Sequence, residues 1–187
     1  MRILPVRNLL SLRNLRLPAY QRPYKWTEPN VRQLIVDISA EESAHSKDRQ
    51  ECTGRSYRLG TVVFHRTTTP SGNDRLDIVD GQQRILTLLL MIQALAHLAR
   101  AGQQNHQHPQ EELAELIENN SLFNELSFSN QLSIDNLRSN YNVALQELRR
   151  VANRQAVTDF LLDRCEVVCF VLEDISEAFH FFDSQNA

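Results

Sequence analysis

The sequence predicts an α+β fold: a small sheet with a central buried helix and a helical insertion. Two observations predict it. Residues 57–79 contain β-type runs around a turn, and a helix that is apolar almost all round follows at 82–100. Helical patterns then dominate 111–164, before a short apolar run at 166–172 returns to the β type. Because a helix that is apolar on all sides is a buried one, the 82–100 helix belongs in the middle of the domain.

The composition fits one domain of a reducing, cytoplasmic compartment. Of the 187 residues 42% are hydrophobic, which suffices for one sizeable core. The net charge of −3 is unlike that of a dedicated DNA-binding module, so any contact with nucleic acid must be local or made by another part of the molecule. The three cysteines are too few for a disulfide framework and lack partners for a zinc site, which predicts buried or idle thiols. Neither a signal peptide nor a membrane-spanning run is found, and no membrane partner is expected.

The first 56 residues predict an extended segment, a helix and a loop. Residues 15–26 contain two prolines, which forbid a helix and push the residues before them toward extended geometry. Thr27 is suited to cap a helix that carries apolar residues at helical spacing to about Glu42. The polar stretch at 43–56 is expected to be a loop.

The next elements are a β-hairpin and the central helix. The runs at 57–64 and 75–79 have β character, and the residues between them include Pro70, Gly72 and Asn73, which favour a turn. The central helix at 82–100 follows directly.

A helical insertion separates the central helix from the end of the sheet. A polar linker leads to helical patterns at 111–118, 133–152 and 155–164. A buried strand at 166–172 and a last helix capped by Asp174 or Ser176 return to the sheet. The predicted organisation is a core at 1–101, an insertion at 102–165 and the return of the core at 166–187.

The segment Asp80-Gly81-Gln82-Gln83-Arg84 lies at the predicted junction of strand and helix. Gly81 allows a sharp turn, the first helical N–H groups lack intrahelical acceptors, and Arg84 is a bidentate donor suited to phosphate. Together they describe a phosphate-binding turn. Two alternatives stay open: Arg84 could form a salt bridge with Asp80, and Asp80 could cap the helix or hold a divalent metal such as Mg²⁺.

Aromatic and cationic residues alternate between Tyr20 and Trp26 in the extended segment. This pattern suits stacking on a base and pairing with phosphates. In the alternative interpretation Tyr20 and Trp26 pack at the edge of the core, while Arg22 and Lys25 face water.

Three blocks of the sequence resemble one protein family in order and spacing. They are LPAYQRPYKW at 17–26, YRLGTVVF and LDIVDGQQRILTLLLMIQAL within 57–95, and ISEAFHFFDSQNA at 175–187. The blocks resemble the N-terminal, DGQQR-containing domain of GmrSD-type proteins, which restrict modified foreign DNA in phage defence. The resemblance implies a fold similar to the ParB/sulfiredoxin superfamily, whose members bind nucleotide phosphates at the loop matching DGQQR.

The resemblance also implies a nucleoside-triphosphate-binding, hydrolysing regulatory domain with Mg²⁺ as a candidate cofactor. The candidate catalytic residues are Asp80, Gln83 and Arg84, with Asp80 also the candidate metal ligand. The candidate nucleotide-binding residues are Arg22, Tyr24, Gly60, Gly81, Gln82 and Asn186. In these roles the arginines neutralise phosphate charge, Asp80 holds the metal or positions water, and a glutamine orients the water or reads the base.

Fused members of this family end in an HNH-type nuclease domain, and no segment of the 187-residue sequence resembles such a domain. We therefore expect DNA to be contacted mainly by a C-terminal part beyond Ala187, no DNA cleavage by this chain alone, and a homodimer as one arrangement. Two other functions stay open. One is a non-catalytic reader of DNA or of a modified base, with a pocket lined by Tyr20, Tyr24 or Trp26. The other is a truncated, inactive interaction module.

Overall fold

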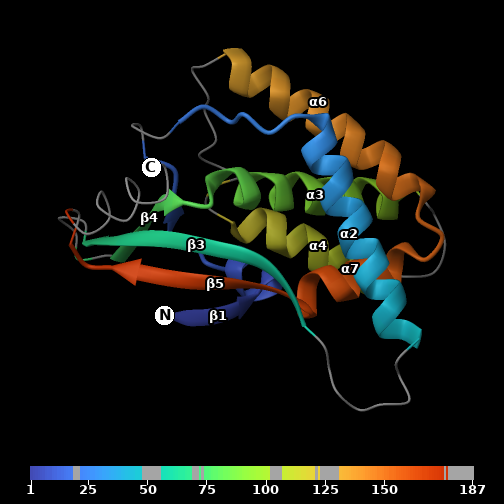
Figure 1. Cartoon of the computed structure of the whole chain (residues 1–187), viewed down its shortest axis with the longest axis horizontal. Coiled ribbons are helices and arrows are strands. Elements are labelled where there is room, and N and C mark those ends of the chain that lie inside the picture. The colour runs from blue at the N-terminus through green and yellow to red at the C-terminus, as the bar shows by residue number, and fades with distance from the viewer. Residues whose placement is uncertain are drawn as a thin grey trace.

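The computed structural model has the predicted α+β architecture, with a mixed sheet and helices that pack against it (Figure 1). It describes residues 1–18, 22–47, 56–68, 72, 74–101, 107–120, 122, 131–174 and 176.

The sheet has five strands in the order β1-β5-β3-β4-β2. They are β1 (Arg2–Pro5), β2 (Leu15–Arg16), β3 (Tyr57–Thr68), β4 (Asp74–Asp80) and β5 (Cys165–Leu172). Strand β3 pairs antiparallel with β4 and parallel with β5, which confirms both the predicted hairpin and the predicted return strand. The edge strands β1 and β2 were not predicted, and they pair with β5 and β4 respectively.

The described helices are α1 (Val6–Leu10), α2 (Glu28–Lys47), α3 (Gln82–Ala101), α4 (Gln107–Asn119), α6 (Gln131–Arg150) and α7 (Arg154–Asp163). The prediction that α2 ends near Glu42 was wrong, because residues 43–47 continue the helix. The last turns of α2 are polar but still packed: the His45 ring lies 5.6 Å from that of Phe160 in α7, and Ser46 donates a hydrogen bond to Glu42.

Helix α3 is the central helix that the sequence predicts. It lies between α6 and α4 (Figure 1), and its buried side chains point in all directions around the helix. By length and composition alone α3 would also be able to cross a membrane. Most of its apolar side chains are buried inside the domain, however, as in the core helix of a folded protein.

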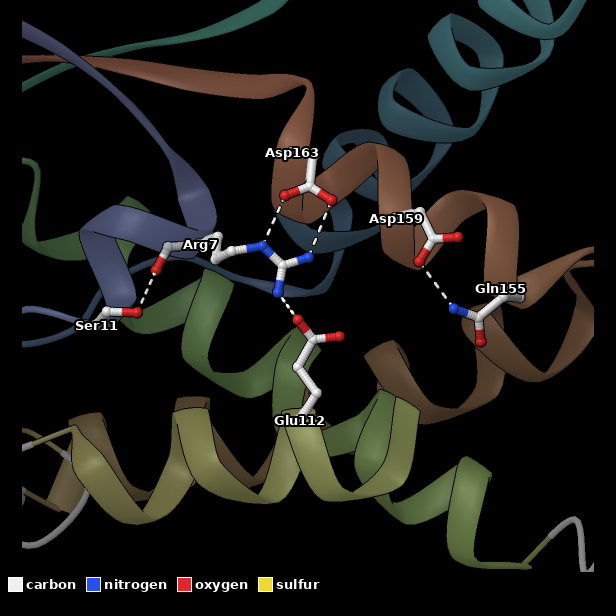
Figure 2. Close-up of polar contacts among 6 residues, drawn as sticks. All are labelled: Arg7, Ser11, Glu112, Gln155, Asp159 and Asp163. Carbon is white, nitrogen blue, oxygen red and sulfur yellow. Dashed lines mark hydrogen bonds and ion pairs between the residues drawn. The ribbon is translucent and has the colours of Figure 1, made fainter. Parts of the chain in front are cut away.

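One arginine joins the beginning of the chain to the helical region (Figure 2). In α1, Arg7 donates from Nε and Nη2 to the two carboxylate oxygens of Asp163, at 2.6 and 2.9 Å, and its Nη1 pairs with Glu112 of α4. The hydrogen bond from Arg7 is the main reason why the pKa of Asp163 lies below its usual value. Because Asp163 ends α7 two residues before β5, this contact links three helices close to the beginning of that strand.

Replacing the Asp163 carboxylate should make the free energy of unfolding less dependent on pH. A carboxylate with a lowered folded-state pKa contributes stability above its unfolded pKa, and this is lost as the pH falls through the folded value. Asp163→Asn should therefore reduce the free energy of unfolding by about 0.5–1 kcal/mol at about pH 7, and by less at about pH 3. Urea denaturation at both pH values measures this. Asp159→Asn, one turn earlier, is the control because that carboxylate accepts its hydrogen bond from Gln155. A deficit for Asp163→Asn that is equal at both pH values would contradict the account.

Candidate functional site

The turn between β4 and α3 can be made only by a glycine. Gly81 has φ +88°, in the left-handed region that side chains disfavour. A Cβ at this position would also lie 2.7 Å from Cγ1 of Val62 and 3.2 Å from the carbonyl oxygen of Thr61. Both the backbone conformation and the close approach to β3 therefore require Gly81.

The first turn of α3 has backbone donors without intrahelical acceptors. The hydrogen bonds of α3 begin with the N–H of Ile85, which donates to the carbonyl of Gly81 at 3.0 Å. The N–H groups of the preceding helical residues, 82–84, thus have no acceptor within the helix. Since the helix dipole adds a partial positive charge at this end, an anion is favoured there.

Arg84 lies against the backbone of Gly60. At Gly60 the pairing of β3 with β5 shifts register, and the residue has φ +117°. A Cβ at Gly60 would lie 2.9 Å from Nη2 of Arg84 and 3.0 Å from its Cζ. The glycine thus leaves the space that the guanidinium occupies. The two residues, predicted separately for the site, are neighbours in the structure.

The Arg84 guanidinium has a backbone acceptor but no carboxylate partner in the part of the chain that the structure describes. Its Nη1 donates to the carbonyl of Thr61 at 2.9 Å. Among the described residues no carboxylate lies within ion-pair distance of Arg84, so the alternative of a salt bridge with Asp80 is not what the structure has. Burial lowers the pKa of Arg84, and the nearby charge of Asp80 offsets this in part. A half-buried cation of this kind would gain from an anionic ligand.

The side chain of Gln83 binds backbone groups of the extended 22–26 segment. Its Oε1 accepts from the N–H groups of Lys25 and Trp26, at 2.7 and 3.1 Å, and its Nε2 donates to the carbonyl of Pro23 at 3.1 Å. Both lone pairs of Oε1 are thus occupied. The structure therefore gives Gln83 a holding role, and its role toward water or a base stays a prediction.

Gln82 holds the beginning of the same segment. Its side chain is buried, and Nε2 donates to the carbonyl of Arg22 at 2.9 Å. The Arg22 backbone is thereby fixed beside the first turn of α3, while its side chain is exposed. The structure thus brings the backbone of Arg22 to the turn that carries Arg84.

Tyr24, predicted to contact the nucleotide, is fully buried in the core. Its hydroxyl lies 2.8 Å from Oγ1 of Thr87 and accepts from Nδ2 of Asn140 at 2.9 Å. Because the Thr87 hydroxyl already donates to the carbonyl of Gln83, Tyr24 is the donor in the bond with Thr87. Burial is the main cause that raises the pKa of Tyr24. The face of its ring is thus not open to a base.

Three polar residues of α6 that the sequence analysis missed hold the 22–26 segment from the other side. Ser133 Oγ accepts from the N–H of Tyr24 at 3.0 Å, and Nδ2 of Asn136 donates to the carbonyl of Tyr24 at 3.0 Å. Nδ2 of Asn140 donates to the carbonyl of Trp26 at 2.8 Å. The spacing of three and then four residues places them on one face of α6, and this polar stripe was the signal that could have found them.

The remaining candidates are not gathered into a metal site. Asp80 ends β4 beside the turn and is partly exposed. In the part of the chain that the structure describes, no three His, Cys, Asp or Glu side chains group as metal ligands. A magnesium ion at Asp80 would therefore need phosphate oxygens to complete its coordination. Tyr20 and Asn186 lie outside the described residues.

The described cysteines are structural. Cys165 and Cys169 are buried in β5, and burial raises their pKa values to about 12 and about 11. At neutral pH both are protonated thiols, which makes them poor nucleophiles and metal ligands. The prediction of buried or idle thiols is confirmed for these two, and Cys52 lies outside the described residues.

Comparison with known proteins adds one finding. Residues 6–187 match the model of a protein family described as the N-terminal domain of the GmrSD restriction endonuclease. A search of curated proteins finds no match. The matched range includes the turn at Gly81, the 22–26 segment and the polar face of α6.

The close approach at Gly81 can be tested against a second glycine. Gly72 also has a positive φ, +81°, but a Cβ there would meet nothing within 4 Å. Both alanine variants carry backbone strain of about 1 kcal/mol or more, and only Gly81→Ala adds overlap with Val62. Gly81→Ala should therefore reduce the free energy of unfolding by about 1–3 kcal/mol more than Gly72→Ala in urea denaturation. Equal losses would show that Val62 does not crowd the turn.

The buried hydroxyl of Tyr24 should contribute to stability. Tyr24→Phe removes two hydrogen bonds in the core and leaves Thr87 without its donor, which should cost about 1–3 kcal/mol of unfolding free energy. Tyr141→Phe is the control, since its hydroxyl bonds the exposed His97 at 2.9 Å and should contribute about 0.5 kcal/mol or less. Thermal unfolding of both variants gives the comparison, and similar losses would contradict the importance of the Tyr24 network.

Proposed function

Because the chain belongs to the family of GmrSD restriction endonuclease N-terminal domains, we propose that it binds a nucleoside triphosphate at the turn between β4 and α3. We further propose that it hydrolyses this nucleotide as the regulatory domain of a modification-dependent restriction protein. One observation carries the proposal. The half-buried Arg84 guanidinium lies over Gly60 without an ion-pair partner among the described residues, in the first turn of a helix whose first N–H groups have no acceptor within the helix.

These groups supply what polyphosphate binding needs. Phosphate oxygens would accept from the N–H groups at 81–84 and from the guanidinium N–H groups that Thr61 does not use. The missing Cβ at Gly60 gives the guanidinium its place, and the missing Cβ at Gly81 lets the turn lie against Val62, so both glycines are needed for the arrangement of these donors. Arg22, at the edge of the site, would add a second cation for the terminal phosphate.

Hydrolysis would use the same residues together with Asp80. Attack by water on the terminal phosphorus breaks its bond to the bridging oxygen, and negative charge collects on the oxygens that leave. Arg84 and Arg22 would neutralise this charge. Asp80 would hold Mg²⁺ against the phosphates, where the ion supplies further neutralisation, or would orient the attacking water.

In this proposal the domain acts as a cytoplasmic switch and not as the nuclease. DNA would be bound and cut mainly by another part of the restriction protein, and a homodimer is compatible with the arrangement. The net charge of −3 supports this division, because binding to the DNA backbone depends on basic surfaces.

Arg84→Ala should weaken triphosphate binding about tenfold to a hundredfold, since charge-assisted hydrogen bonds contribute about 1.5–3 kcal/mol each. Isothermal titration of the wild type and the variant with ATP, GTP, CTP and UTP, each with Mg²⁺, measures the loss and identifies the preferred nucleotide. Arg100→Ala is the matched control, an exposed arginine at the other end of α3. Equal affinities of the wild type and Arg84→Ala would show that the triphosphate does not bind at this turn.

Phosphate release separates hydrolysis from binding alone. Asp80→Asn should bind the triphosphate but release phosphate at least about tenfold more slowly than the wild type. If the wild type binds and releases none, the domain is a sensor and not a hydrolase. If it binds no triphosphate but discriminates modified from plain duplex DNA at two salt concentrations, it is a DNA reader and the proposal fails.

A further inference from the structure

We propose that α6 is part of the nucleotide switch, with Ser133 and Asn136 as positioning residues that hold the 22–26 segment, and so Arg22, on the first turn of α3. Nucleotide affinity and the packing of α6 are then coupled. The inference rests on the proposed function and names a regulatory element for that site.

The 22–26 segment is held between two helices through its backbone. From α3, Gln83 bonds Pro23, Lys25 and Trp26, at 2.7–3.1 Å. From α6, Ser133 and Asn136 bond the N–H and the carbonyl of Tyr24, both at 3.0 Å. Without regular secondary structure of its own, the segment takes its position from these two sets of contacts.

Because the hydrogen bonds between α6 and the 22–26 segment are buried, breaking them is energetically costly. Tyr24, Ser133 and Asn140 have no exposed surface. A displacement of α6 would leave the N–H and the carbonyl of Tyr24 without these partners in the core and would remove the hydrogen bond from Asn140 to its hydroxyl, where water does not replace them. The segment and α6 are therefore expected to move together.

A chain of hydrogen bonds also connects α6 to the turn itself. Asn140 donates to the hydroxyl of Tyr24, which donates to Thr87, whose hydroxyl donates to the carbonyl of Gln83, with no step longer than 2.9 Å. Gln83 lies in the first turn of α3, beside Arg84. Any ligand that fixes this turn thus favours one position of α6, and by linkage the position of α6 alters the affinity for the ligand.

Arg22 is the group through which α6 would act on the nucleotide. Its carbonyl is held by Gln82 at 2.9 Å, and its backbone continues directly into the part that α6 holds. Among the interactions of the described residues, Ser133 and Asn136 contact Tyr24 and not the turn. They are therefore positioning residues, and their loss should affect binding only as far as Arg22 contributes to it.

The first test measures triphosphate affinity in α6 variants. Asn136→Ala and Ser133→Ala should each weaken binding about fivefold or more, because a smaller share of the molecules has Arg22 in place. Val143→Ala is the matched control: it removes buried apolar surface from the same helix but none of the hydrogen bonds from α6 to the 22–26 segment, and should change affinity by less than about twofold. All variants are measured well below their unfolding temperatures.

A double-variant cycle shows whether the effect passes through Arg22. In an Arg22→Ala background, Asn136→Ala should weaken binding further by less than about twofold, since Arg22 is no longer there to be positioned. Hydrogen–deuterium exchange gives a readout besides affinity. Addition of the triphosphate should slow exchange at the amides of residues 24–26 in the wild type, and this effect should be smaller in Asn136→Ala.

The outcomes are distinguishable. A wild type that binds no triphosphate overturns the proposed function, and this inference with it. A wild type that binds while Asn136→Ala binds equally well overturns the inference alone. So does an effect of Val143→Ala as large as that of Asn136→Ala, because α6 would then act only through general stability.

Discussion

The contact between the Arg84 guanidinium and the backbone of Gly60 determines how the rest of the site must be built. The cation can lie there only because β3 has an irregular register and a residue without Cβ at this point. It also requires the first turn of α3 to come against β3, which Gly81 allows by its φ of +88° and its closeness to Val62. A charged group is thereby taken out of much of its water without a carboxylate at contact distance among the described residues.

The surrounding polar contacts follow from the same arrangement. The 22–26 segment lies between α3 and α6, and its buried backbone groups must find partners there. Gln83 supplies them from one helix, and Ser133, Asn136 and Asn140 supply them from the other. Buried polar groups can be satisfied in few arrangements. This network therefore specifies how the two helices pack and where the backbone of Arg22 lies.

The sequence predicted those parts of the fold that local patterns encode. The hairpin, the central helix and the return strand are marked by β-type or apolar runs between turn residues, and all three are present. The short strands β1 and β2 were missed because they are short and take their structure from partners far along the chain. Residues 43–47 were missed because contacts with α7, and not an apolar pattern of their own, keep them helical.

The candidate site was predictable only in part for the same reason. Gly81 and Arg84 could be predicted because a glycine and an arginine at a strand-to-helix junction are residue types suited to a phosphate-binding turn. Gly60 was predicted from the family resemblance. The holding role of Gln82 and Gln83 depends on a segment about 60 residues earlier, which no local pattern shows. Tyr24 looked like a ring for stacking on a base, yet its burial depends on Thr87 and on α6.

Phosphate binding at the turn between β4 and α3 can be measured without a contribution from base or ribose, by titration with inorganic tripolyphosphate and Mg²⁺ followed by ¹H–¹⁵N NMR. We expect the largest changes in chemical shift at the amides of Gly60 and residues 81–84 and at Nε of Arg84. Changes centred instead on His97 and Arg100, which line a cavity at the other end of α3, would contradict it, as would no changes at saturating ligand.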